Sequence, residues 1–159
     1  MTSTLVARAA LAAVTASEGT SVANHSIRSF LFADILAKHE GVLDDAVYDQ
    51  NLLFSACVMH DLGTGTKAPS EQRFEVEGAD LAAEVLIQHR VTAADVDRVW
   101  EAIALHNSRG IAERWGLLAY LTRAGIRIDF GDRTDVVMSQ AQRIHAEYPR
   151  LGMAESLAD

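Results

Sequence analysis

Residues 51–63, NLLFSACVMHDLG, decide the fold of this chain. The run is apolar on nearly every side of a helix, and it ends in the adjacent pair His60 and Asp61 before a glycine-rich loop begins at Gly63. A helix that is apolar all round is typically buried in the centre of a domain. An imidazole nitrogen beside a carboxylate oxygen offers two ligands for a divalent metal ion. The stretch therefore predicts a buried central helix whose end carries part of a metal site.

Helical periodicity continues on both sides of this stretch. Apolar residues recur at helical spacing in segments that we expect to form helices at 4–17, 24–38, 44–60 or 45–60, 81–89 with a lead-in at 74–79, 92–106, 117–128, and 132–148 or 134–148. The sequence contains no clear alternating run of strand length, no repeat and no low-complexity tract. It therefore predicts an all-α, single-domain helical bundle of about six to seven helices.

Length and composition fit one globular domain. The chain has 159 residues, of which 49% are hydrophobic and 23% are charged, with only two prolines. A chain of this length buries a sizeable core without disulfides, and this composition is typical of globular rather than disordered proteins. We therefore assign residues 1–159 to a single domain, with 1–19 as an N-terminal helix and 20–150 as the core.

Charge and cysteine content limit the partners and the compartment. The net charge is −8, and no basic stripe for a nucleic acid is visible. The single cysteine, Cys57, lies in an apolar run, which fits a reducing compartment. Arg8 interrupts the apolar N-terminal run, which favours an ordinary helix over a signal peptide, and no run reaches the ~18 apolar residues of a membrane span. We expect a cytoplasmic protein with a small-molecule substrate and no nucleic-acid or membrane partner, and a homo-oligomer stays open.

Two further residues stand where the ligands of a helical-bundle site are expected. His25 lies near the start of one predicted helix, and Asp129 lies at the end of another. Ligands of such sites project inward from facing helices. Each residue also has an ordinary explanation, because a histidine in a first helical turn is commonly on the surface and an aspartate near a glycine is a common turn residue. With His60 and Asp61 they make two imidazoles and two carboxylates, a set that suits Zn²⁺, Fe²⁺ or Mn²⁺ better than Mg²⁺.

The order of these residues resembles the HD-domain superfamily of metal-dependent hydrolases. Within it, the closer resemblance is to bacterial HD-domain proteins related to cyanamide hydratase. Five stretches carry the resemblance in the same order, namely 24–28 NHSIR, 60–64 HDLGT, 73–79 RFEVEGA, 99–106 VWEAIALH and 124–131 AGIRIDFG. The resemblance implies the helical HD fold and a metal-dependent hydrolase or hydratase.

The resemblance also implies a ligand set for a single metal. Zinc is expected first, with iron and manganese as alternatives. Some HD proteins bind a second metal through extra histidines, one of them just before the Gly-Ala step, where this chain has Phe74 and Glu75. That binuclear set is incomplete, so we expect one metal. The implied ligands are His25, His60, Asp61 and Asp129.

His106 and Glu75 are candidate catalytic residues, besides the metal-bound Asp61. His106 ends the fourth matching stretch and could polarise the substrate or relay a proton, with a hydrogen-bonded core histidine as the equal alternative. Glu75, or less favourably Glu77, could serve as a general base or hold a metal ligand in place. Carboxylates at helix starts are also common because of the helix dipole alone.

Arg28, Thr64 and Lys67 complete the list of candidate catalytic residues. Arg28 could pair with Asp61 or meet an anionic substrate. Thr64 and Lys67 lie in the long loop that directly follows the His-Asp pair, where binding groups tend to be. Many HD enzymes have a lysine close behind that pair. Lys67 comes later, which departs from the phosphohydrolase pattern.

Three functions are compatible with these residues. A divalent ion with an open position lowers the pKa of bound water towards ~7 and supplies hydroxide at neutral pH. In the favoured interpretation, hydroxide adds to the carbon of a small nitrile-like substrate such as cyanamide and gives urea. The first alternative is a phosphohydrolase acting on a nucleoside monophosphate or another phosphoester, and the second is a non-catalytic binding protein on the HD fold. The phosphohydrolase needs cations around its transition state, and the obvious ones are Arg28, Lys67, Arg73 and Arg109.

Overall fold

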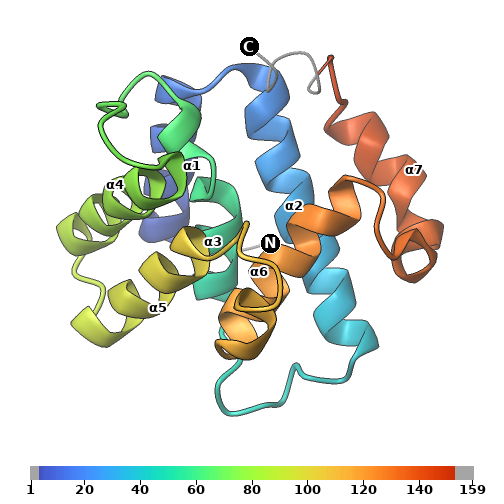
Figure 1. Cartoon of the computed structure of the whole chain (residues 1–159). Helices are drawn as coiled ribbons and strands as arrows, with labels where there is room; N and C mark the ends of the chain where they lie inside the picture. The colour runs from blue at the N-terminus through green and yellow to red at the C-terminus, as the bar shows by residue number, and fades with distance from the viewer. Residues whose placement is uncertain (1–3, 153–159) are drawn as a thin grey trace.

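The helices of the chain follow one another without any other regular structure in the computed structural model, which describes residues 4–152 (Figure 1). Within that range, seven α-helices and three short 3-10 helices are present, and there is no strand. The predicted all-α class, with six to seven helices, is confirmed. The bounds are α1 Leu5–Ser17, α2 Thr20–His39, α3 Gln50–Met59, η1 Leu62–Thr64, α4 Phe74–Gln88, α5 Ala93–Ala104, η2 Ala112–Arg114, α6 Leu117–Asp129, η3 Thr134–Val137 and α7 Met138–Glu147.

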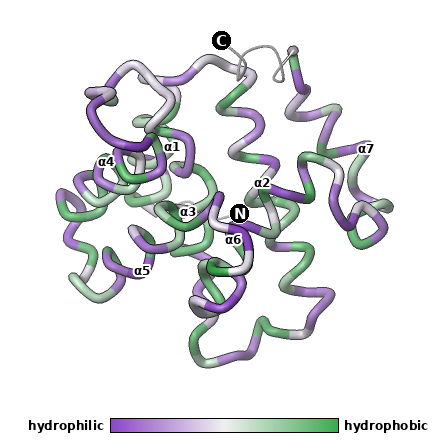
Figure 2. Tube along the Cα trace, viewed as in Figure 1, coloured by the Kyte–Doolittle hydropathy of each residue, from purple (hydrophilic) through white to green (hydrophobic). Residues whose placement is uncertain are grey.

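Helix α3 lies in the centre of the bundle, as its apolar sequence predicts. Every residue from Leu52 to Met59 is buried. Helices α1, α2, α5 and α6 pack around it, and Figure 2 shows hydrophobic residues along its length. The hydrophobic effect therefore holds in the core the helix that directly precedes the His-Asp pair.

The start of α3 differs from the predicted position. Asp45 does not begin a helix, because its carboxylate accepts the N–H of Val47 in a turn at 2.9 Å. Asp49 is the true cap, and its carboxylate accepts the N–H of Leu52 at 3.1 Å. An N-terminal cap of this kind satisfies a backbone donor that the helix leaves free, so the helix begins at Gln50.

Helix α2 begins earlier than predicted and is buried at its second turn. The helix starts at Thr20, and Asn24 lies inside it rather than capping it. The Asn24 side-chain amide donates to the carbonyl of Pro149 at 3.0 Å. His25 is consequently in the interior, with 1% of its surface exposed, so it is not a surface histidine.

Helix α4 begins at Phe74, so the lead-in at 74–79 is already helical and forms its first turns. The loop before it is tied to the helix by Glu77, whose carboxylate accepts three backbone N–H groups. These come from Ser70 at 2.9 Å, Glu71 at 2.6 Å and Gln72 at 2.8 Å. The carboxylate of Glu77, the less favoured of the two candidate glutamates, thus fixes the loop 70–72 to the first turn of α4.

A glycine brings α2 and α6 into close contact. A Cβ atom at Gly125 would lie 2.3 Å from the carbonyl oxygen of Ser29 and 2.7 Å from the Cβ of Ala33. Only a residue without a side chain allows the two backbones to approach this closely. The contact sets His25 of α2 beside Asp129 at the end of α6.

The N-terminal helix α1 packs on the bundle of its own chain. Its Ala7, Ala10 and Val14 are buried, and the helix contacts α3 and α4. Between residues 4 and 152, none of the helices combines the length and the apolar character that crossing a bilayer requires.

Candidate metal centre

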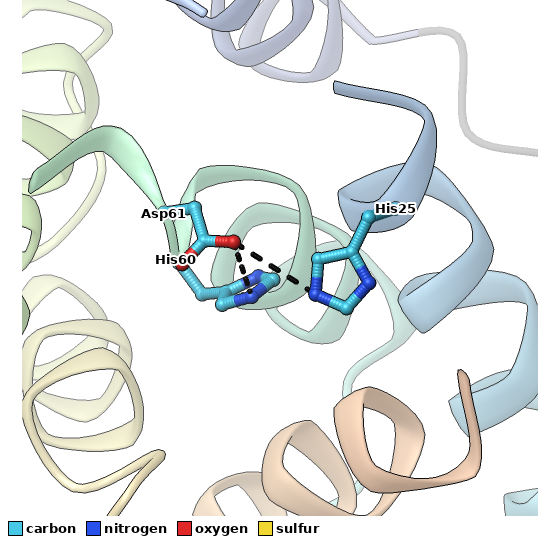
Figure 3. Close-up of side chains that lie close together, drawn as sticks. All are labelled: His25, His60 and Asp61. Atoms are coloured by element: carbon cyan, nitrogen blue, oxygen red, sulfur yellow. Dashed lines mark ion pairs between the residues drawn. The ribbon is translucent and has the colours of Figure 1, made fainter. Parts of the chain in front are cut away.

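Three side chains converge at the C-terminal end of α3 (Figure 3). His60 and Asp61 directly follow the last residue of α3, and His25 reaches them from α2. One ligand atom from each residue lies within 4.8 Å of the other two, and all three residues are buried. Two imidazole nitrogens and a carboxylate oxygen in this arrangement can hold one divalent ion.

Hydrogen bonds on the far side of each ring decide which nitrogen faces the centre. Nδ1 of His60 lies 2.6 Å from the carbonyl of Cys57, and Nδ1 of His25 lies 2.6 Å from Oδ2 of Asp129. Both Nδ1 atoms therefore donate, which leaves each Nε2 for the centre. Oδ2 of Asp61 lies 3.1 Å from Nε2 of His60 and 3.8 Å from Nε2 of His25, the two contacts that are dashed in Figure 3.

Asp129 lies behind His25 and outside the three-residue cluster. Besides His25, both of its oxygens have a partner in Arg28, whose Nε donates to Oδ1 at 2.7 Å and whose Nη2 donates to Oδ2 at 2.9 Å. The side chains of Arg28 and Asp129 are fully buried. The structure thus brings together three of the four residues that the resemblance implies as ligands, and the fourth orients one of them.

Arg28 pairs with Asp129 and not with Asp61. Its remaining amino group, Nη1, donates to the carbonyl of Tyr148 at 2.7 Å. Each of the three guanidinium nitrogens thus has an acceptor inside the protein, and two of these bonds fix the carboxylate of Asp129.

Burial and neighbouring charges act in opposite directions on the pKa values of the site residues. Burial favours the neutral carboxyl of Asp61, but the charge and hydrogen bond of His60 and the charge of His25 hold its pKa below the usual range. Burial would lower the pKa of His60, and the neighbouring Asp61 raises it instead. Burial likewise opposes ionisation of Asp129, whose pKa is brought down to about 2 by the hydrogen bonds from His25 and Arg28. Because Arg28 already neutralises Asp129, the ionised Asp61 is the carboxylate that favours a cation at the cluster.

His106 stands beside the cluster. Its ring centroid is 4.9 Å from that of His60, and its Nδ1 lies 2.6 Å from the carbonyl of Ile103. Burial, together with the charge of His60, lowers the pKa of His106 to about 4. The ring is therefore neutral at pH 7, and Nε2 can accept a hydrogen bond but cannot donate one.

Glu75 lies next to His106 rather than in the cluster. Its carboxylate accepts from the side-chain amide of Asn107 at 3.2 Å and from Nη2 of Arg73 at 3.4 Å, and its charge acts on His106. Burial opposes ionisation of Glu75, but hydrogen bonds from its own backbone N–H, Asn107 and Arg73 lower its pKa. Glu75 is thus an anionic neighbour of the candidate proton acceptor.

The two candidates from the loop after the pair do not join the cluster. Thr64 donates its hydroxyl to the backbone carbonyl of Asp61 at 2.8 Å and so closes the turn. Lys67 is exposed and lines a surface cavity with residues of α1 and α4, a cavity whose lining includes none of the three cluster residues.

One acidic side chain near the centre was not singled out by the sequence analysis. Glu18 follows α1, and both of its carboxylate oxygens are buried, with no hydrogen-bond partner among residues 4–152. Burial, together with the charge of Asp61, raises the pKa of Glu18 to about 8. In the sequence it stands before Gly19 at the end of a predicted helix, and no spacing relates it to His60. Only the folded chain shows that Glu18 belongs to this region.

Comparisons with known proteins identify the family of this chain. A family model for the HD domain matches residues 22–147. Cyanamide hydratase DDI2 and cyanamide hydratase DDI3, both from Saccharomyces cerevisiae, are each 28% identical to this chain over 137 residues. The matched region covers 82% of this chain and 59% of each yeast protein, so the chain spans less than two thirds of their length. The chain belongs to the HD domain family.

Proposed function

We propose that this protein is a metal-dependent enzyme that adds water to a small molecule, and that its substrate is a nitrile-like compound such as cyanamide. The observation that carries the proposal is the convergence of His25, His60 and Asp61 on one point in the interior. The likeness to two yeast cyanamide hydratases supports the substrate class.

The donor set fits one divalent ion. Nε2 of His25, Nε2 of His60 and a carboxylate oxygen of Asp61 would hold it, and this mixture of nitrogen and oxygen suits zinc first, with iron or manganese as alternatives. When bound with incomplete protein ligation, such an ion lowers the pKa of water and polarises the group that it contacts.

We assign Asp129 the task of orienting His25. The resemblance implies Asp129 as a fourth ligand, but direct binding would require its carboxylate to release His25 or Arg28. Carboxylates behind ligating histidines commonly fix the ring and raise its basicity. The buried Arg28 in turn keeps Asp129 ionised and in place.

The proposed reaction adds one water molecule across a carbon–nitrogen triple bond. An O–C bond forms, one π bond of C≡N breaks with its electron pair moving to nitrogen, and nitrogen gains a proton that oxygen loses. A second proton shift from oxygen to nitrogen gives the amide, which for cyanamide is urea.

Residues beside the cluster have tasks that fit this reaction. Because His106 is neutral and uses Nδ1 for Ile103, its Nε2 can accept an N–H from the amino group of cyanamide. Aromatic rings border the imidazoles on two sides, with centroids 5.8 Å apart for Phe74 and His106 and 4.7 Å apart for Phe130 and His25. Such apolar walls exclude competing water and suit a small, weakly charged substrate.

The phosphohydrolase alternative receives less support, because the expected cations have other partners or lie elsewhere. Arg28 is hydrogen-bonded to Asp129, Lys67 lines a different cavity, and Arg73 is largely exposed beside Glu75. Arg109 lines a groove of about 700 Å³ on the outer side of α6, together with Arg123, Arg127 and Arg133. That groove includes none of the three cluster residues, so a phosphoryl group at the cluster would lack its charge neutralisation.

The test is the metal content of untagged protein, measured by elemental analysis for the wild type and Asp61→Ala. Asp132→Ala, at an exposed aspartate on the surface, is the matched control. We expect one equivalent of zinc or iron in the wild type and the control, and none in Asp61→Ala. The loaded wild type should then release urea from cyanamide, and nucleoside monophosphates should serve as poor substrates.

Three results would overturn parts of this proposal. Two equivalents of metal would replace the mononuclear site with a binuclear one. Release of phosphate from nucleoside monophosphates without hydration of cyanamide would favour the phosphohydrolase. An absence of metal after growth in supplemented medium would leave a non-catalytic binding protein.

A further inference from the structure

Glu18 is a buried carboxylate with no donor, placed against the loop that leaves the metal centre. The carbonyl of Ser17 accepts the N–H of Thr66 at 2.9 Å, and a Cβ at Gly65 would lie 2.6 Å from that same carbonyl. The C-terminal end of α1 is thereby fixed on the backbone that follows Asp61. Both oxygens of Glu18 are inaccessible to solvent and unpaired in the described part of the chain, residues 4–152.

A buried carboxylate without a hydrogen-bond donor destabilises the folded protein unless a ligand supplies the donor. Burying a polar group without a hydrogen bond destabilises a protein, and native structures leave few such groups. The neighbouring acids show the usual solution, since Asp129 receives its donors from His25 and Arg28. The charges that act on the Glu18 carboxyl come from Asp61 and His60, two residues of the metal centre. We therefore expect a ligand at the metal centre to supply the hydrogen-bond donor that Glu18 lacks.

We infer that Glu18 is a further catalytic residue, whose carboxylate accepts a hydrogen bond, and then a proton, from the water molecule that reacts at the metal centre. The inference rests on the proposed function, because it requires an ion and a reacting water. It assigns a task to the side chain that no other contact explains.

Glu18 can accept and then return the proton that moves during the hydration step. An O–H bond of water breaks and its proton moves to a Glu18 oxygen, while the water oxygen forms the new bond to the nitrile carbon. The π electron pair moves to nitrogen, and nitrogen then takes the proton back from Glu18. Burial and Asp61 raise the pKa of the carboxyl in the metal-free protein, and a nearby cation favours its ionised form.

The test compares Glu18→Gln with the wild type and with Glu84→Gln as the matched control. Glu84 is an exposed acid of α4 on the side of the molecule where Ser17 and Leu62 lie. Each protein is stripped with a chelator and titrated with Zn²⁺, and the dissociation constant and the thermal midpoint with and without zinc are measured. Glu18→Asp, which keeps the charge but shortens its reach, is the second variant.

We expect Glu18→Gln to bind one zinc about tenfold more weakly than the wild type, because groups around a metal centre typically contribute 10–100-fold to affinity. Its zinc-dependent rise in midpoint should shrink, while its metal-free midpoint should equal or exceed that of the wild type. Its hydration rate at saturating zinc should fall by about 100-fold, the usual contribution of a general base. Glu18→Asp should recover the affinity but not the rate, and Glu84→Gln should match the wild type.

Several results would overturn the inference, and they are distinct from failure of the proposed function. Unchanged affinity and rate in Glu18→Gln would remove Glu18 from the site. A lower metal-free midpoint with an unchanged zinc-dependent rise would make Glu18 structural. Complete loss of zinc would make it a metal ligand. A wild type that binds no zinc, and no iron or manganese when these are titrated in its place, would instead overturn the proposed function itself.

Discussion

The carboxylates of two glutamates in this molecule have opposite surroundings. Glu77 holds the loop before α4 by accepting three backbone N–H groups, from Ser70, Glu71 and Gln72. Glu18, at the end of α1, accepts none from the described residues. Folding alone satisfies the first carboxylate, so its role is structural. The described residues supply no hydrogen-bond donor to the Glu18 carboxylate. A buried polar group without a partner in the protein is typical of a group that acts on a ligand.

Both carboxylate oxygens of Asp129 accept hydrogen bonds inside the protein. Substitution of its partner Arg28 has the largest predicted effect on stability. Arg28→Met should lower the free energy of unfolding by about 3 to 5 kcal/mol, because breaking a buried ion pair leaves an uncompensated charge. Urea denaturation would measure the loss. The control is Arg127→Met, whose partner Asp132 is exposed at the surface, so that solvent screening should make its loss much smaller. Equal losses in the two variants would contradict the distinction between buried and exposed carboxylate pairs.

Gly125→Ala should have the next largest effect, because it disturbs the approach that satisfies Asp129. The new Cβ would meet the backbone of Ser29, which cannot move without separating α2 from α6. We expect a loss of about 2 to 3 kcal/mol in thermal or urea unfolding, the upper part of the usual range for overpacking. Gly19→Ala is the control, since no atom lies within 4 Å of its added Cβ. A change below 1 kcal/mol in Gly125→Ala would mean that the helices tolerate a wider spacing.

The helices were predictable from the sequence because periodicity and apolar content act locally. The run that ends at His60 contains enough information to bury α3, and the order of His25, His60 and Asp61 is enough to predict a metal centre. The exact start of α4 was not predictable, because its N-cap residue Arg73 makes no side-chain capping hydrogen bond that would mark the first turn. Where such a cap is missing, a sequence places a helix end only to within a few residues.

The contacts among the site residues were harder to predict than the residues themselves. Asp129 and His25 are 104 positions apart in the chain, and their contact depends on how closely α2 and α6 approach. A sequence shows that a carboxylate is available but not whether Arg28 has already engaged it. Glu18 lies outside every matching stretch, so only packing of α1 on the loop after Asp61 reveals it.

Glu77→Gln should loosen the loop and leave the bundle folded. The amides of Ser70, Glu71 and Gln72 should exchange their hydrogens faster, because a neutral amide oxygen is a weaker acceptor than a carboxylate. The control is Glu71→Gln, which changes an exposed side chain in the same loop. Unchanged exchange at the three amides in Glu77→Gln would show that the loop is held by other contacts.

The same loop should respond to acid in the wild type. Burial opposes ionisation of Glu77, but the hydrogen bonds from Gln72, Glu71 and Ser70 lower its pKa below the ordinary value of 4.5. A carboxylate with a lowered folded pKa stabilises the folded loop above pH 4.5, and the contribution disappears as the pH falls through the lowered pKa. Protection of the three amides, after correction for intrinsic exchange rates, should therefore fall only below pH 4.5 and should be independent of pH in Glu77→Gln. Loss of protection at neutral pH would contradict the assignment.

The smallest predicted effect on stability is also the one that separates the two glutamates most directly. Glu18→Leu replaces an unpaired buried carboxylate with an apolar side chain of similar size, so the metal-free protein should keep its free energy of unfolding or gain up to about 1 kcal/mol. Glu77→Leu removes the acceptor of three backbone donors and should destabilise the loop in the same assay. The two variants make the same Glu→Leu substitution, so a difference in sign comes from the surroundings of each carboxyl group, including the protonation state that those surroundings impose. A loss of stability in Glu18→Leu would mean that Glu18 already has a partner in the folded chain, and that its carboxylate is held for structure rather than kept free for a ligand.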